Sequence, residues 1–186
     1  MFERIIQIDK NILIYLNNLG NETWDPFWLF ITNQLNWAPV FLLILFLIFK
    51  NFGWKKGGVL FLFLILMVAF SDQFTNMIRG VFERLRPNND TSISHLLRTL
   101  IRPQSYSFTS GHATTSMVFT VFIYLLFKDK YKYIRLLFIF PLIFAYSRLY
   151  LGVHFPIDIL TGATIGSLIG IVFFKLHLKL QKRLFS

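Results

Sequence analysis

The sequence predicts an all-α protein: a polytopic integral-membrane helical bundle of five to six transmembrane helices, with an interfacial helix at its N-terminus. Of its 186 residues, 55% are hydrophobic and 23 are Phe. These apolar residues fall in long blocks, where a soluble domain would scatter them at amphipathic spacing. No Pro-, Gly- or Ser-rich linker divides the blocks, so we expect a single domain over residues 1–186.

The N-terminal stretch Met1–Gly20 mixes charged and apolar side chains and lacks a small-residue cleavage site. We therefore expect a short amphipathic helix at the membrane surface and not a removable signal peptide. The blocks after it carry little or no charge, and with their flanks each approaches the roughly 20 residues that a crossing helix needs. They are Phe27–Phe49, Gly57–Ser71, Thr109–Phe127, Leu136–Ser147 and Ile159–Phe174. Backbone polar groups cannot stay unpaired in lipid, so these blocks must be helical.

The first block leaves the number of crossings open. It is interrupted by Asn33, Gln34, Asn36 and Pro39. The block is either one long kinked span or a short helix followed by a span. Five crossings are expected, and a sixth is an alternative.

Lysine positions predict the orientation of the bundle. The lysines gather in two connectors and the tail: Lys50, Lys55 and Lys56, then Lys128, Lys130 and Lys132, then Lys175, Lys179 and Lys182. These segments share one side by span parity, and the positive-inside rule makes that side cytoplasmic. Arg79–Phe108 and Arg148–Pro156 then lie on the outer face of the cytoplasmic membrane, periplasmic or extracellular.

Arginine follows a different distribution. Six of the nine arginines fall in these outer segments, which contain no lysine: Arg79, Arg84, Arg86, Arg98, Arg102 and Arg148. The positive-inside rule disfavours so many outside, so they must serve a purpose there. A planar guanidinium grips phosphate through two parallel hydrogen bonds, and we expect an anionic, phosphorylated ligand.

Other classes are excluded by composition. The net charge of +10 would suit nucleic acid, but no basic stripe interleaved with aromatic residues follows a polar face. Cysteine is absent, which excludes disulfides, a thiolate nucleophile and a cysteine metal site.

Two short motifs open the third and fifth predicted spans. Ser110 and Gly111 stand where a helix begins, with Thr109 as a possible cap and His112 next in the chain. Unpaired amides and the helix dipole favour an anion at such a position. Taken alone, however, a histidine at a helix start is more often a cap or surface residue than a catalyst.

The second motif pairs a histidine with a carboxylate. Asp158 follows His154 by four residues, on the same face of a helix that Pro156 would begin. The carboxylate could hold one imidazole nitrogen and leave the other to attack phosphorus. The alternative is an acidic residue that only stabilises a helix N-terminus.

Together these stretches resemble the type 2 phosphatidic acid phosphatase family, which includes glucose-6-phosphatase and, more distantly, the vanadium haloperoxidases. The family pattern is Lys, six residues, Arg-Pro; Pro-Ser-Gly-His; and Ser-Arg, five residues, His, three residues, Asp. Every spacing matches between Arg79 and Asp158. Two residues depart from it: Arg79 replaces lysine, which keeps the charge but changes its shape, and Thr109 replaces proline.

The resemblance implies a role for each motif residue. His154 would be the nucleophile that forms a phosphohistidine, Asp158 would orient it, and His112 would be the general acid. The phosphate would be bound by Arg79, Arg86, Ser110, Gly111 and Arg148. Neither a metal nor a cofactor is implied.

The expected activity is that of a lipid phosphate or diphosphate phosphatase, with the lipid bilayer and a membrane lipid phosphate as its partners. Candidate substrates are undecaprenyl diphosphate, phosphatidylglycerol phosphate, phosphatidic acid and lipid A phosphate. The alternatives are hydrolysis or transfer from a soluble phosphate ester, and a non-enzymatic lipid transporter or phosphate sensor. We also expect Asp72, two turns before Arg79, to form a salt bridge with it.

Overall fold

The computed structural model describes residues 1–185, and within this range the chain is helical without a β-strand. The α-helices are α1 (Phe2–Asn18), α2 (Asp25–Thr32), α3 (Ala38–Phe82), α4 (Gly111–Phe127), α5 (Ile139–Tyr150) and α6 (Pro156–Phe185). Four short 3₁₀ helices lie between them, η1 (Gln34–Trp37), η2 (Pro87–Asn89), η3 (Ser94–Leu96) and η4 (Lys132–Phe138). The predicted all-α class is confirmed.

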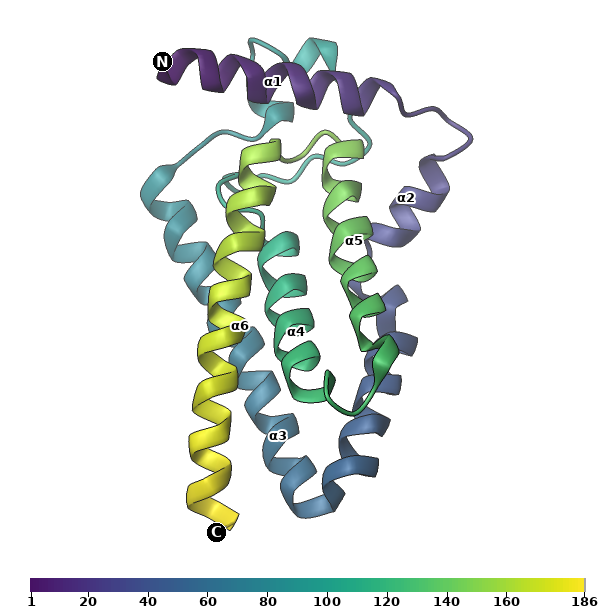
Figure 1. Ribbon diagram of the computed structural model, residues 1–186. Helices are drawn as coiled ribbons and strands as arrows, with labels where there is room; N and C mark the ends of the chain where they lie inside the picture. Colours follow the sequence, from purple (N-terminus) through teal and green to yellow (C-terminus); the bar gives the residue numbers. More distant parts are fainter. Residues whose placement is uncertain (186) are drawn as a thin grey trace.

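The long helix α3 consists of two antiparallel legs. Gly53 has φ 68° and ψ 179°, a backbone conformation that residues with a side chain avoid. The chain reverses direction there, as Figure 1 shows, so that residues 38–52 and 54–82 form two legs that diverge from the bend. The first two predicted spans are these legs, and a tight bend replaces the connector expected between them.

Three stretches of the described residues are candidates for crossing the membrane. The stretches Gln34–Asn89, Lys132–Tyr150 and Pro156–Phe185 are long and apolar enough to do so, and the first contains both legs of α3. The shorter apolar helix α4 has 17 residues and lies among the others (Figure 1). By contrast, α2 has only 8 residues. At 1.5 Å per residue it spans about 12 Å of a hydrocarbon layer roughly 30 Å thick, so the first block is a short helix followed by a span.

The helices α4 and α6 pack closely through glycines. A Cβ atom on Gly162 would lie 2.7 Å from the carbonyl oxygen of Ser110, and one on Gly170 would lie 2.9 Å from that of Val118. Any larger residue would push the two backbones apart. These two glycines, eight residues apart on α6, therefore belong to helix packing.

The helix α1 lies across one end of the bundle (Figure 1). Its inner face buries Asp9, Leu13 and Asn17, which are at most 2% exposed. A neighbouring flank leaves five large apolar side chains exposed: Ile5, Ile8, Ile12, Tyr15 and Leu19. One face against protein and an apolar flank beside it are typical of an interfacial helix.

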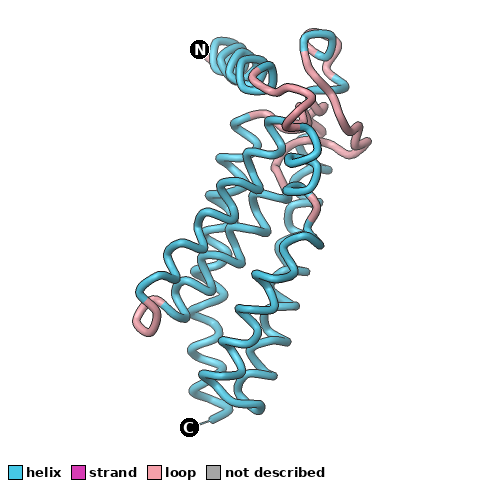
Figure 2. The backbone as a smooth tube through the Cα atoms, turned by 90° about the vertical axis from the view of Figure 1, so that its right-hand side faces the viewer, coloured by secondary structure: helices cyan, strands magenta, loops and turns pink. Residues whose placement is uncertain are grey.

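Most of the loop structure gathers at the same end as α1 (Figure 2). The bend at Gly53, the connector from α4 to η4 and the C-terminal end of α6 lie toward the other end. The three lysine-rich segments are therefore separated from the loops that contain the arginines and histidines.

Candidate active site

The three motif stretches meet at the end of the bundle where α1 lies. Each predicted site residue comes from a helix end or an adjacent loop: Arg79 from the end of α3, Arg86 from the following loop, Ser110 to His112 from the start of α4, Arg148 from the end of α5, His154 from the loop after it and Asp158 from the first turn of α6. Helix ends are where backbone groups remain available to a ligand.

His154 lies between a carboxylate and a guanidinium. Its Nδ1 is 3.4 Å from Oδ2 of Asp158, and its Nε2 is 3.0 Å from Nη1 of Arg86. Because a guanidinium can only donate, this contact assigns the lone pair to Nε2 and the proton to Nδ1, which donates to Asp158. The side chain is only 1% exposed. Burial, and next the charges of Arg86 and Arg148, hold the pKa of His154 well below its usual value, so the ring is neutral.

Arg86 is fixed by three further contacts. Its Nε donates to the Ser105 carbonyl at 2.7 Å, its Nη2 to the Ser105 hydroxyl at 3.0 Å and its Nη1 to the Val153 carbonyl at 2.9 Å. Arginine keeps its charge at neutral pH, so Arg86 brings a positive charge to Nε2 of His154. Ser105, which no sequence pattern indicated, thus helps to aim Arg86 at His154.

The start of α4 differs in detail from the prediction. Ser110, and not Thr109, is the N-cap, and its side chain accepts from the Ala113 amide at 3.4 Å. The Ser110 amide donates to the carbonyl of Asp158 at 3.0 Å. That amide is engaged and not free for a phosphoryl oxygen, whereas the hydroxyl still has a proton to donate. The cap residue was misassigned because both residues have a capping hydroxyl and only the backbone course decides between them.

Arg79 lies directly over this helix start. Its Nε donates to the Thr109 carbonyl at 3.1 Å, and a Cβ on Gly111 would lie 3.0 Å from its Nη2. Glycine at this position therefore lets the guanidinium reach the first amides of α4. The expected salt bridge from Asp72 to Arg79 is wrong. Asn76 lies between them and contacts Asp72 at 3.3 Å and Arg79 at 3.1 Å.

Arg148 and His112 meet at Thr32, the last residue of α2. The Thr32 hydroxyl accepts from Nη1 of Arg148, and its carbonyl faces the His112 ring. His112 also stacks on Phe144, with ring centroids 4.7 Å apart. Within residues 1–185 the buried Nε of Arg148 has no hydrogen-bond partner. An unpaired guanidinium nitrogen in a buried site is suited to an anionic ligand.

Arg84 has a role that the sequence did not reveal. Its Nη1 lies 2.7 Å from Oδ1 of Asp158, and its Nη2 lies 2.7 Å from Oδ2 of Asp9 on α1. On the sequence alone, Arg84 was counted among the outer arginines. No sequence motif near Arg84 indicates a contact with Asp9, which lies 75 residues earlier. Burial is the main cause that raises the pKa of Asp9.

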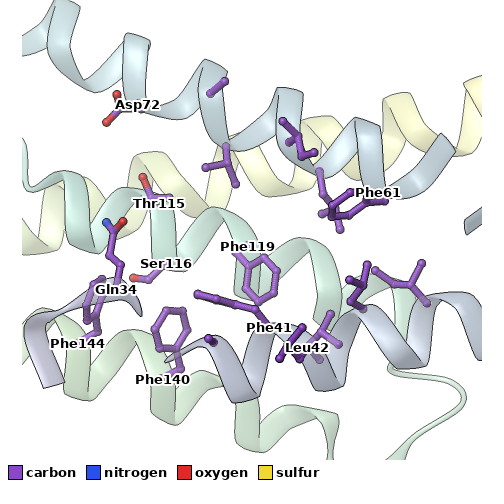
Figure 3. Close-up of a pocket in the computed structure, with 18 residues that line it drawn as sticks. Gln34, Phe41, Leu42, Phe61, Asp72, Thr115, Ser116, Phe119, Phe140 and Phe144 are labelled. Carbon is purple, nitrogen blue, oxygen red and sulfur yellow. The ribbon is translucent and has the colours of Figure 1, made fainter. Parts of the chain in front are cut away.

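An apolar groove of about 810 Å³ lies between the two legs of α3, with α4 and α5 beside it. Its lining consists mostly of Leu, Ile and Phe side chains, and its polar members are Gln34, Asp72, Thr115 and Ser116. Figure 3 shows these polar side chains at one end of the groove, together with Phe144, while Leu42 and Phe61 lie toward the other. Because Phe144 stacks on His112, the polar end adjoins the histidine site.

Fold and site together define a helical membrane protein that gathers arginines and two histidines at one end of its helices. Residues 60–182 match the PAP2 superfamily, and the chain belongs to that superfamily. It is 33% identical over 190 residues to the lipid A 4'-phosphatase of Bacteroides thetaiotaomicron, covering 100% of this chain and 84% of that protein.

Two further relatives fit the same family. The undecaprenyl-diphosphatase of Sulfolobus acidocaldarius is 33% identical over 158 residues, with 85% of this chain and 66% of that protein covered. The crystal structure of a transmembrane PAP2-type phosphatidylglycerolphosphate phosphatase from Bacillus subtilis superposes with a TM-score of 0.74 at 20% identity, covering 95% of this chain and 87% of that one. The chain is thus a multi-pass membrane enzyme, a phosphoric ester hydrolase, and the resemblance drawn from its motifs is confirmed.

Proposed function

We propose that the chain hydrolyses a lipid phosphate or diphosphate through a phosphohistidine at His154, on the outer face of the cytoplasmic membrane. The observation that carries the proposal is the setting of the His154 ring, with Nδ1 toward Asp158 and Nε2 toward Arg86. The attacking lone pair thereby lies beside the group that would hold a phosphoryl oxygen. Residues 1–186 form one membrane phosphatase domain in this proposal.

The reaction proceeds in two steps. In the first, Nε2 of His154 attacks phosphorus, the bond from phosphorus to the leaving oxygen breaks, and His112 gives that oxygen a proton. In the second, water attacks the phosphohistidine, His112 takes a proton from the water, and inorganic phosphate leaves. Asp158 stabilises the positive charge that the His154 ring carries while it is bonded to phosphorus.

The surrounding cations stabilise the transferred group. Arg79, Arg86 and Arg148 supply three guanidinium groups around the start of α4, where the Gly111 amide and the Ser110 hydroxyl also donate. Phosphoryl transfer spreads negative charge over the equatorial oxygens, and donors already in place for that charge lower the barrier. In these steps no cofactor takes part.

The apolar groove supports a lipid as the substrate. Its polar end adjoins His112 through Phe144, and its remaining length is lined by apolar side chains of α3, α4 and α5. A lipid with its phosphate at His154 could lay a hydrocarbon chain there, which would remove apolar surface from water. A soluble phosphate ester gains nothing from such a groove.

The test is release of inorganic phosphate by purified protein in detergent. The panel contains lipid A, undecaprenyl diphosphate, phosphatidylglycerol phosphate, phosphatidic acid and a soluble sugar phosphate. We expect lipid A phosphate to have the highest kcat/KM, because the relative matched over the whole chain is a lipid A 4'-phosphatase. A higher kcat/KM for the soluble ester than for every lipid would contradict the lipid assignment.

The same assay tests the mechanism for a metal requirement. Activity should persist in excess EDTA, because the proposed steps use only side chains and backbone amides. Orthovanadate should inhibit competitively, since it resembles phosphate and its vanadium can bond to His154 as phosphorus would. Loss of activity to EDTA that a divalent cation restores would overturn the metal-free phosphohistidine mechanism.

The outer location can be tested by cysteine labelling, because the chain has no native cysteine. Asn89 is exposed at the active-site end, and Asp129 is exposed in the lysine-rich connector toward the other end. On intact cells we expect N89C to react with an impermeant thiol reagent and D129C to react only after lysis. The reverse pattern would place the active site on the cytoplasmic side.

A further inference from the structure

The inner face of α1 places the buried carboxylate of Asp9 beside the active site. Asp9 is 2% exposed, although it belongs to a helix at the surface of the bundle. Its Oδ1 accepts from the Ile157 amide at 2.9 Å, in the first turn of α6. Its Oδ2 accepts from Nη2 of Arg84 at 2.7 Å. Asp9 therefore caps the helix that carries Asp158, from a position 148 residues before Ile157.

Arg84 connects this carboxylate to the catalytic pair. Its Nη1 donates to Oδ1 of Asp158 at 2.7 Å, and its guanidinium lies 3.8 Å from the ring centroid of Phe155. The other oxygen of Asp158, Oδ2, accepts from the Phe155 amide at 2.9 Å and faces Nδ1 of His154 at 3.4 Å. Contacts thus run without a break from Asp9 through Arg84 and Asp158 to His154.

Arg84 is shared between the carboxylates of Asp9 and Asp158, and this sharing leaves Oδ2 of Asp158 available to His154. A guanidinium prefers to bind one carboxylate with both of its parallel N–H groups. Asp9 occupies one side of Arg84, so Asp158 receives only the other and keeps Oδ2 for Nδ1 of His154. Without a charge at position 9, Arg84 would turn both nitrogens onto Asp158 and draw Oδ2 away from the imidazole.

Independent contacts hold α1 in the position that this arrangement requires. Asn17, two turns after Asp9, donates to the Tyr150 carbonyl at 2.6 Å and accepts from the Arg98 amide at 2.7 Å. Leu13 is fully buried between them. The position of Asp9 is therefore fixed by protein contacts further along α1.

We propose that Asp9 and Arg84 are positioning residues for the reaction: together they hold Asp158 in the orientation that directs His154 at phosphorus. This inference rests on the proposed role of His154 as the nucleophile. It assigns a function in catalysis to the N-terminal interfacial helix, which lies outside the matched residues 60–182.

The main test is D9N, which keeps the shape of the side chain and the acceptor for Ile157 but removes the charge that Arg84 needs. We expect kcat to fall about 10- to 100-fold while KM changes less than about twofold, because phosphate binding does not involve Asp9. R84K should lose kcat similarly, since one ammonium cannot bridge two carboxylates in the same geometry. Both variants are measured on a nitrophenyl phosphate and on the best lipid substrate.

The matched control is K10Q on the same helix. It removes the 2.8 Å ion pair between Lys10 and Asp90, which ties α1 to a loop without touching the site. We expect its kcat to stay within about twofold of wild type, because a partly exposed ion pair contributes little to stability and neither partner contacts the site. Thermal unfolding in detergent measures the folded fraction of every variant, and kcat is expressed per folded enzyme.

A double-mutant cycle distinguishes positioning from general destabilisation. If Asp9 acts through Asp158, D9N should lower kcat in the wild-type background but not further in D158A. Unchanged kcat in both D9N and R84K, a loss confined to KM, or a D9N loss that recurs undiminished in D158A would overturn the inference. Failure of the proposed function has a different result, namely a fully active H154A enzyme.

Discussion

Replacing His154 with alanine is expected to lower kcat on lipid and soluble phosphate esters alike by about 10⁴-fold or more, since the covalent step loses its only nucleophile. No phosphoenzyme should be trapped from a labelled substrate in H154A. The variant should still fold, because Asp158 keeps its contacts with Arg84 and the Phe155 amide.

The control for this experiment is His95, an exposed histidine in the loop after α3. H95A should retain wild-type kcat and the phosphoenzyme. If H154A still formed a phosphoenzyme, the nucleophile would have to be a different residue.

The buried setting of His154 also predicts the pH dependence. Only the neutral ring can attack phosphorus, and its pKa lies well below the usual value of 6.5 because of burial and the neighbouring arginines. The neutral form therefore persists as the pH falls through 6.5, and the acidic limb of kcat/KM should lie below that pH. An acidic limb at or above pH 6.5 that is assigned to His154 would contradict this environment.

The second large effect is expected at His112, and it should depend on the leaving group. H112A should lower kcat about 10²- to 10⁴-fold on a lipid phosphate, whose alkoxide leaves poorly without a proton. A nitrophenolate leaves readily without an acid, so the loss on nitrophenyl phosphate should be much smaller for the first step. Measuring the burst of nitrophenol isolates that step from hydrolysis of the phosphohistidine.

The comparison between substrates is what identifies the acid. H154A serves as the reference, because loss of the nucleophile should affect both substrates equally. Equal losses in H112A on the lipid and on the nitrophenyl ester would remove the case for His112 as the proton donor. In that event its stacking on Phe144, at the polar end of the groove, would indicate a role in substrate placement.

Local patterns in the sequence were sufficient for the membrane architecture. The apolar blocks predicted the crossing segments, because lipid demands helical backbone and apolar side chains over a fixed length. The lysine-rich segments lie apart from the histidine site, as their alternation along the chain predicted. The four-residue offset from His154 to Asp158 predicted their contact, but the predicted reason was wrong: His154 lies in the loop before α6, and only Asp158 belongs to the helix.

The sequence left open what depends on the path of the backbone between elements. The choice between one kinked span and a short helix followed by a span was decided by α2, which ends after only 8 residues. The backbone conformation of Gly53 decided where the chain reverses direction. Thr32 contacts both His112 and Arg148, and Arg148 lies 116 positions after it in the sequence. Nothing in its neighbours distinguishes it from any other helix-terminal threonine.

By itself, the sequence determined that this protein is a membrane-embedded bundle and which histidines and arginines come to one end of it. Those features depend on hydrophobic length, helical periodicity and motif spacing, which are local properties. The tertiary structure alone decided that Asp9 caps α6, that Arg84 is shared between two aspartates and that the Ser110 amide is engaged. Such contacts join residues far apart in the chain, and only the packing of α1, α3 and α6 against one another brings their polar atoms within hydrogen-bond distance.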